Sequence, residues 1–275
     1  MKSFAKMHGA GNDFIIVDNR QNDIINPSQM AVKVCDRHFG VGADGFMLVE
    51  LSKISDIKMA FYNSDGREAT MCGNGIRCFA KFVYDEGIVK KESFHVETGD
   101  GIKQISIVQS EETESIVKVD MGKWTFSALT INQNGEEVIN KKIAVGDDTI
   151  EISCVHMGVP HGVIFVDEID ENKTIRYGSI IEKNSSFPQG INVNFSKVIN
   201  QQSMHVDTWE RGAGKTLACG TGVCSSVIVA NRLGKVGQEV VVNVAGGQLK
   251  INLINEDKIT MEGKAVTICK GMLYL

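Results

Sequence analysis

The chain has 275 residues, 43% of them hydrophobic and 23% charged, and its net charge is −5. This composition predicts a globular protein of one large domain or two medium ones, and it excludes the basic stripe of a nucleic-acid-binding protein. The longest apolar runs, such as residues 223–230, are too short to span a bilayer. Because Lys6 stands where a signal peptide would be apolar, we expect a cytoplasmic protein.

In the first half of the chain, a strand is predicted at residues 14–17, where a β-rich run is bounded by turn residues. A helix is predicted from Asn26, the cap, and Pro27, the first helical residue, to about Arg37. A second helix, apolar over much of its surface, is predicted at about 75–86. The other strands predicted here are 46–51, 57–62, 102–108 and 116–120.

In the second half, a third helix is predicted at about 222–233, and it too is apolar enough to be buried. The β-rich runs of this half predict strands at 150–156, 162–166, 240–244, 249–253 and 259–262. The whole pattern predicts a mixed α/β fold with many short strands and few helices.

The chain contains 7 cysteines, an odd number, and no secretion signal is recognised, so we expect no disulfide framework. Cys35, Cys154 and Cys269 are predicted to be small core residues. Cys78 and Cys224 lie inside predicted helices and are expected to pack there.

An internal repeat is the main clue to function. The segment Cys-Gly-Asn-Gly-Ile at 72–76 matches Cys-Gly-Thr-Gly-Val at 219–223, and Cys219 lies 147 positions after Cys72. Nine positions before each cysteine stands a polar residue, Asn63 or Glu210. The same element in both halves predicts duplication into two similar α/β units, which could bring both cysteines to one cleft.

A cysteine at a helix N-terminus lies near free N–H groups and the positive end of the helix dipole, so we expect a lowered thiol pKa. The glycines that follow allow close approach of a ligand, and the N–H groups can hold a carboxylate. Two such sites on opposite sides of a substrate would supply a base and an acid, an arrangement that suits inversion of an amino-acid Cα.

Two other interpretations of the cysteines remain open. Four thiols, those of Cys72, Cys78, Cys219 and Cys224, could bind zinc, but their spacings differ from those of common zinc sites and we expect no metal. The chain could also be a non-catalytic thiol protein that binds an amino acid or a metal. A redox switch would be compatible with catalysis.

The motifs of the whole chain resemble those of the diaminopimelate epimerase family. The resemblance rests on ordered segments at residues 6–14, 42–45, 62–66, 71–78, 157–161, 190–195, 209–214 and 217–222. It implies a pseudo-twofold pair of similar domains, each a β-sheet wrapped around a central helix, with the active site in the cleft between them. The implied domains are residues 1–118 with 264–275, and 119–263. It also implies a homodimer.

The resemblance implies a reaction without pyridoxal phosphate or any other cofactor on a diamino diacid of lysine and peptidoglycan biosynthesis. Cys72 and Cys219 would be the acid and base, with His161 and Glu210 as further catalytic candidates. The groups expected to hold the reacting carboxylate are Gly73, Asn74, Gly220 and Thr221. Those expected on the amino groups are Asn12 and Glu210. The distal end of the substrate would be held by Asn63, Asn192 and Arg211.

Two positions depart from the family pattern. Val159 stands where the family has Asn, which removes a polar contact to the distal end of the substrate. Lys215 replaces Glu close to Cys219, and it could lower the pKa of that thiol or compensate for a charge elsewhere. Another amino acid as substrate, such as histidine or lanthionine, therefore stays an alternative.

Overall fold

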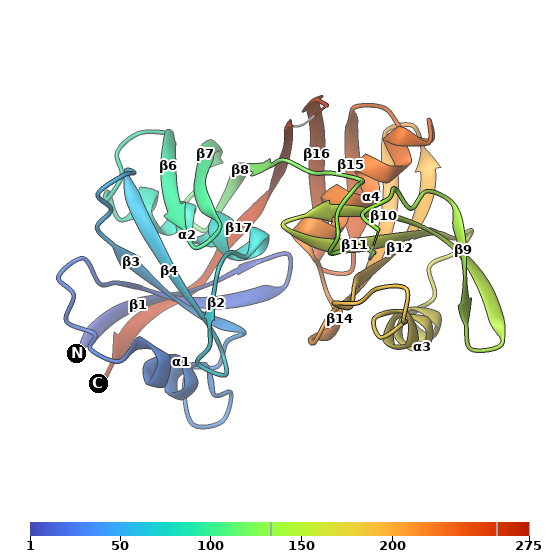
Figure 1. The fold of residues 1–275 in the computed structure, drawn as a ribbon. Coiled ribbons are helices and arrows are strands. Elements are labelled where there is room, and N and C mark those ends of the chain that lie inside the picture. Colours follow the sequence, from blue (N-terminus) through green and yellow to red (C-terminus); the bar gives the residue numbers. More distant parts are fainter. Residues whose placement is uncertain (133, 257, 275) are drawn as a thin grey trace. The chain divides into compact units, whose positions relative to one another are not determined.

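The structure is a computed structural model that describes residues 1–132, 134–256 and 258–274. The chain divides into two compact units (Figure 1). The first consists of Met1–Asp120 with Glu262–Leu275, and the second of Met121–Met261. Within the described residues, no helix is both long and apolar enough to cross a membrane.

The first unit is built mainly of strands, with two helices among its described residues. Its elements in chain order are β1 (Lys2–Gly9), β2 (Asn12–Asp18), α1 (Pro27–Cys35), β3 (Gly45–Glu50), β4 (Ile57–Asn63), β5 (Glu68–Ala69), α2 (Gly73–Asp85), β6 (Ser93–Thr98), β7 (Gly101–Ser110) and β8 (Glu114–Gly122). The long final strand β17 (Lys258–Leu273) adds its later residues to this unit.

The strands of the first unit form a ladder that returns on itself. β2 pairs with β3 and β4 pairs with β6 in parallel, while β1–β2, β3–β4, β6–β7 and β7–β8 are antiparallel. β17 pairs with both β1 and β8 and so completes the ladder. The residues of α2 from Gly73 to Val83 are all buried, and α2 contacts β1, β2, β3 and β7. The sheet thus wraps around a central helix.

The second unit repeats this plan. Its elements are β9 (Lys141–Val145), β10 (Asp148–Met157), β11 (Val159–Phe165), α3 (Glu171–Ile181), β12 (Asn192–Asn200), β13 (Ser203–Glu210), β14 (Gly214–Thr216), α4 (Gly220–Arg232), β15 (Glu239–Val244) and β16 (Gly247–Asn255). The parallel pairs are β11–β12 and β13–β15, which match β2–β3 and β4–β6. α4 is the buried central helix, in contact with β10, β11, β12, β13 and β16.

The two units also agree in register. α4 begins and ends 147 positions after α2, the same offset that separates the two cysteines. Phe14 pairs with Gly45 in the first unit, and at the same offset His161 pairs with Asn192 in the second. The prediction of two similar α/β units with a central helix in each is confirmed.

A glycine in each central helix allows this helix to pack directly on its sheet. A Cβ atom at Gly75 would overlap Met47 of β3, and one at Gly222 would overlap the amide of Asn194 on β12. The glycines after each cysteine therefore have a packing role as well as the ligand role predicted from the sequence.

Three expectations need correction. α2 and α4 begin at Gly73 and Gly220, two residues earlier than predicted, because the glycines belong to the first turn. α3 was not predicted, although Asp170 accepts hydrogen bonds from the N–H groups of Asn172 and Lys173 as an N-cap. Cys269 is exposed, so the prediction of a core residue there is wrong.

Candidate active site

Cys72 and Cys219 each stand immediately before the first turn of a buried helix. The backbone is extended at both, with φ −136° and ψ 122° at Cys72 and φ −116° and ψ 110° at Cys219. Their carbonyl groups begin the helices by accepting hydrogen bonds from Ile76 and Val223. Each thiol therefore lies beside first-turn N–H groups that have no carbonyl partner within the helix.

In the first unit, the Cys72 thiol meets an asparagine from the β1–β2 hairpin. Its Sγ donates to Oδ1 of Asn12 over 3.5 Å. Asn12 follows the two-residue turn Ala10–Gly11, whose φ angles of 52° and 83° are both positive, as a tight type I′ hairpin requires. The turn thus fixes the place of Asn12 beside the thiol, and the structure brings these two predicted site residues together.

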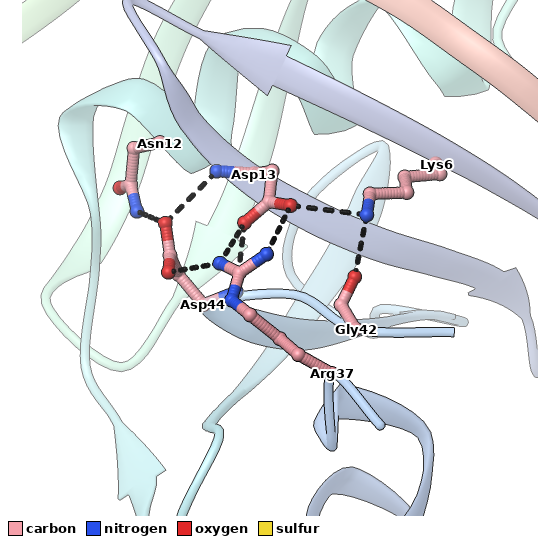
Figure 2. A network of polar contacts seen from close by, with 6 residues as sticks. All are labelled: Lys6, Asn12, Asp13, Arg37, Gly42 and Asp44. Carbon is pink, nitrogen blue, oxygen red and sulfur yellow. Dashed lines mark hydrogen bonds and ion pairs between the residues drawn. The ribbon is translucent and has the colours of Figure 1, made fainter. Parts of the chain in front are cut away.

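The orientation of the Asn12 amide is set by Asp44. Nδ2 of Asn12 donates to Oδ2 of Asp44 over 2.6 Å (Figure 2). A carboxylate oxygen can only accept, so the NH₂ group faces Asp44 and the carbonyl oxygen is left for Cys72. The same carboxylate accepts from the backbone N–H of Asp13 at 3.1 Å and from Arg37 at 2.7 Å.

Two cations anchor this network to the fold. Arg37 donates through both terminal nitrogens to Asp13, at 2.8 and 3.2 Å, and Lys6 lies 3.2 Å from the same carboxylate. Lys6 also donates to the carbonyl of Gly42 at 2.7 Å, as Figure 2 shows. Burial raises the pKa of Asp13, but the hydrogen bonds from Arg37 and Lys6 outweigh it and the net shift is downward. The carboxylate therefore stays charged.

The first turn of α2 is held by a buried arginine. Arg77 donates to the carbonyl of Gly73 at 2.8 Å and to Oδ1 of Asn74 at 3.0 Å, and its side chain is fully buried. Two residues predicted to hold a carboxylate are thus fixed by the same guanidinium. Asn63 ends β4 in register with Gly45, at a sheet position that the repeat relates to Glu210.

In the second unit, Cys219 is 6% exposed and its Sγ lies 3.5 Å from Oγ1 of Thr221. Burial raises the pKa of Cys219 well above that of a free thiol, and the carboxylate of Glu210 raises it further. Hydrogen bonds from Thr221 and from the backbone of Gly222 lower the pKa, but by less than burial and Glu210 raise it. The expected lowering of the pKa is therefore wrong for Cys219, because desolvation of the thiolate exceeds the effect of the helix terminus.

His161 lies directly behind this pair. Its Nε2 is 3.1 Å from Oγ1 of Thr221, and its ring is fully buried. Burial lowers the pKa of His161 to about 3, with smaller contributions from His156 and Arg211. The imidazole is therefore neutral at physiological pH, and the hydroxyl of Thr221 links it to Cys219.

The predicted distal-end residues of this unit adjoin one another. Oδ1 of Asn192 accepts from the backbone N–H of Arg211 at 2.8 Å, and its Nδ2 donates to the carbonyl of Pro160 at 3.3 Å. Arg211 is held through Nη1 by the carbonyl of Gln189 at 2.6 Å. Val159 begins β11, next to Pro160.

Lys215 forms ion pairs with two carboxylates. Its Nζ lies 3.2 Å from Glu171 and 3.5 Å from Asp207, whose side chain is only 7% exposed. The cation is not among the largest causes of the raised pKa of Cys219. Of the two effects considered for this departure, compensation of a charge elsewhere agrees with the structure.

The sequence did not assign roles to three residues that support these sites. Asp44 orients Asn12 from 32 positions away, and Asn194 and Thr208 lie behind His161 on β12 and β13. Two of them fall in motifs already singled out, the segments 42–45 and 190–195. Their contacts depend on strand register, which the motifs alone do not reveal.

The remaining cysteines do not extend the site. Cys78 and Cys224 are fully buried within α2 and α4, and burial raises the pKa of Cys78 to about 12. Among the described residues, no group of three or more His, Cys, Asp or Glu side chains could hold a metal ion.

Comparisons with known proteins show the family of the chain. The family model described as diaminopimelate epimerase matches residues 4–127 and 153–268. The chain belongs to the diaminopimelate epimerase family. The diaminopimelate epimerase of Alkaliphilus metalliredigens is 50% identical over 272 residues, which cover 98% of this chain and 96% of that protein. That of Clostridium perfringens is 50% identical over 270 residues, 98% of either chain.

Solved structures with much lower sequence identity share the fold. A PhzF-family phenazine biosynthesis protein of Bacillus anthracis is 17% identical with a TM-score of 0.72, and each chain is covered completely. A probable proline racemase of Agrobacterium radiobacter is 13% identical with a TM-score of 0.73, over 100% of this chain and 93% of that one. The architecture of the family is therefore shared with proteins of distant sequence.

Proposed function

We propose that the chain is an isomerase that interconverts LL- and meso-diaminopimelate, with Cys72 and Cys219 as the two proton-transferring groups. The observation that carries the proposal is that both thiols occupy the same position, at the start of a buried helix, in two units of one plan. Family membership and the 50% identity to proteins named diaminopimelate epimerase support the choice of substrate.

Each step of the proposed reaction balances. With Cys219 as thiolate, its sulfur takes the proton from Cα, and the electron pair of the C–H bond stays on the substrate as a carbanion stabilised by the carboxylate. The Cys72 thiol then gives its proton to the opposite face of Cα. The enzyme is left with a Cys219 thiol and a Cys72 thiolate, which is the state needed for the reverse direction.

The raised pKa of Cys219 has two opposing effects on this step. A thiolate with a high pKa is a stronger base once it is formed, but burial also makes it the less populated form. The hydrogen bond from Thr221 favours the charged form once it is produced. Glu210 raises the pKa of Cys219, so a thiolate formed there is more basic.

The substrate carboxylate at the reacting centre would be held by first-turn N–H groups. Those of α2 begin at Gly73 and Asn74, and those of α4 at Gly220 and Thr221. Such groups stabilise the negative charge that develops in the transition state. Asn12, with its carbonyl oxygen held toward the thiol, is oriented to accept from a substrate amino group. Glu210 would receive the same amino group from the second unit.

The distal amino acid end would be held by Asn63, Asn192 and Arg211. The guanidinium of Arg211 offers a bidentate carboxylate contact. Val159 supplies no polar group there, so a second candidate keeps the mechanism and changes the substrate, to histidine or lanthionine for example. We further propose that the protein acts in the cytoplasm as a homodimer and needs no cofactor, in lysine and peptidoglycan biosynthesis.

The test compares Cys72→Ala and Cys219→Ala with the parent protein, without added pyridoxal phosphate or metal. We expect each change to lower epimerisation of LL-diaminopimelate by about 10³-fold or more, because each removes a proton-transferring group. Cys269→Ala, which removes an exposed thiol, is the matched control and should behave as the parent. Near-normal turnover in either of the first two variants would overturn the proposal.

The substrate is tested by Cα hydrogen–deuterium exchange over free amino acids. Diaminopimelate should exchange fastest. Exchange with histidine or lanthionine but not with diaminopimelate would favour the second candidate, and Val159→Asn would then show whether this position sets the preference.

A further inference from the structure

A buried chain of hydrogen bonds leads away from Cys219 into the second unit. It starts with two residues at the beginning of α4 and continues through one residue each on β11, β12 and β13, and these last three are nearly or fully inaccessible to solvent. The members in order are Cys219, Thr221, His161, Asn194 and Thr208.

The amide of Asn194 has only one orientation that satisfies its partners. One amide atom lies 3.0 Å from the carbonyl oxygen of Gly162, which can only accept, so this atom is the NH₂ group Nδ2. The other lies 3.1 Å from Oγ1 of Thr208, which donates to it as Oδ1. Asn194 is fully buried and α4 packs closely against it at Gly222, so these partners alone set the orientation of the amide.

This orientation decides which nitrogen of His161 carries the proton. Nδ2 of Asn194 also lies 3.2 Å from Nδ1 of His161, and because it is a donor, Nδ1 must be the acceptor. In a neutral imidazole the proton is then on Nε2, which donates to Oγ1 of Thr221 at 3.1 Å. The hydroxyl hydrogen of Thr221 is thereby left for Sγ of Cys219.

We propose that Asn194 is a positioning residue that fixes His161 as the Nε2–H tautomer and so directs the Thr221 hydroxyl to donate to Cys219. The catalytic meaning of this assignment rests on the proposed function, whereas the tautomer itself does not. The low pKa of His161, about 3, agrees with a ring that stays neutral while the reaction proceeds.

The first test is made on the unaltered protein. Ring ¹⁵N chemical shifts of His161, assigned with a His161→Gln variant, should show protonated Nε2 and unprotonated Nδ1 from pH 6 to pH 9. Protonated Nδ1 in the unaltered protein would overturn the proposal, whatever the protein catalyses.

The second test changes Asn194→Asp. A carboxylate accepts a proton where the amide donated one, so Nδ1 of His161 should become protonated. Asn194→Leu, of similar size, serves if the charged variant does not fold, and it should also allow protonation of Nδ1. Ser196→Ala is the matched control, since Ser196 lies two residues along the same strand, is fully buried, and its hydroxyl has no hydrogen-bond partner among the residues that the structure describes. An unprotonated Nδ1 in a folded Asn194 variant would contradict the proposal.

Two kinetic readouts separate positioning from a merely structural role. Loss of a hydrogen bond to a charged sulfur predicts a fall in kcat of about tenfold to hundredfold in Asn194→Asp, with KM changed less than about twofold. Site-resolved alkylation of Cys219 should also require higher pH than in the parent, while that of Cys72 is unchanged. A changed tautomer with parent kinetics and parent alkylation would sink the positioning role. Failure of the proposed function would appear instead as activity retained by Cys219→Ala.

Discussion

The surroundings of the two cysteines differ far more than the backbone that carries them. Behind α2 lie Phe14 and Met47, and at the same offset behind α4 lie His161 and Asn194. The first unit is therefore apolar where the second contains a buried polar chain. Duplication preserved the helix and the thiol, and the side chains behind them diverged.

The difference gives the two thiols opposite hydrogen-bond partners. The Cys72 thiol donates to Asn12, whose carbonyl oxygen is turned toward it by Asp44. Cys219 faces the hydroxyl of Thr221, which receives a hydrogen bond from His161 and is left to donate. The Cys72 thiol is thus a hydrogen-bond donor, whereas Cys219 faces a group placed to donate to it, and this donor offsets part of the rise in pKa that burial gives Cys219.

The difference between the two units is removed most directly by replacing His161 with phenylalanine, the residue at the matching position 14 of the first unit. His161→Phe removes the donor to Thr221, so the hydroxyl no longer has to point at Cys219. We expect kcat to fall by about 100-fold, within the range that a proton-transfer group contributes. Epimerase assays measure this, and turnover within about threefold of the parent would show that the polar chain does not matter.

The same variant isolates the pH dependence of stability that comes from His161. Its pKa is lowered to about 3 in the folded protein, whereas an unfolded histidine has a pKa of about 6.5. Below that value the unfolded chain gains a proton that the folded chain does not, so stability falls as pH falls. Between pH 7.5 and pH 5 the parent should lose about 2 kcal/mol more unfolding free energy than His161→Phe.

Urea unfolding at both pH values measures this difference. Asp13 and the other carboxylates are common to both proteins, so their contributions cancel. Equal losses in the parent and the variant would mean that His161 is not held neutral by burial.

In the first unit, Asp44→Asn removes the carboxylate that orients Asn12. An amide at position 44 can donate as well as accept, so Asn12 is free to turn its NH₂ group toward Cys72. We expect kcat to fall by about tenfold, the equivalent of one hydrogen bond. Asp65→Asn is the control, because Asp65 pairs only with its exposed neighbour Arg67 among the contacts described. Similar kinetics in the two variants would contradict the role of Asp44.

Lys215→Met should affect turnover least. The cation pairs with Asp207 and Glu171 and is not among the largest causes of the raised pKa of Cys219, so kcat should stay within about threefold of the parent. The unfolding free energy should fall by about 1–3 kcal/mol, because the buried Asp207 loses its partner. A shifted pH profile of Cys219 alkylation would show instead that Lys215 tunes the thiol.

The repeat and its glycines predicted much of this arrangement. The Cys-Gly-x-Gly segments predicted two helices headed by cysteine and two similar units, because a duplicated sequence carries its local structure with it. The Asn-Pro pair predicted α1. These features depend on residues close together in the chain, where spacing is informative.

The residues that stand behind the thiols could not be found in this way. Asp44 meets Asn12 and Asn194 meets His161 only because parallel strands bring distant residues into register. The pKa of Cys219 was mispredicted for a related reason, since a helix terminus is visible in the sequence and the burial of the thiol is not. For Cys269 the error runs the other way, because burial was predicted and the side chain is exposed.

Early turnover in D₂O tests the two-cysteine reaction most directly. Because one thiol removes the proton and the other delivers a different one, the meso product formed from the LL isomer should carry deuterium at the inverted Cα. The remaining LL substrate should carry almost none. Product that keeps the original hydrogen, or equal labelling of substrate and product from the start, would mean that a single group moves the proton and would contradict the assigned roles of Cys72 and Cys219.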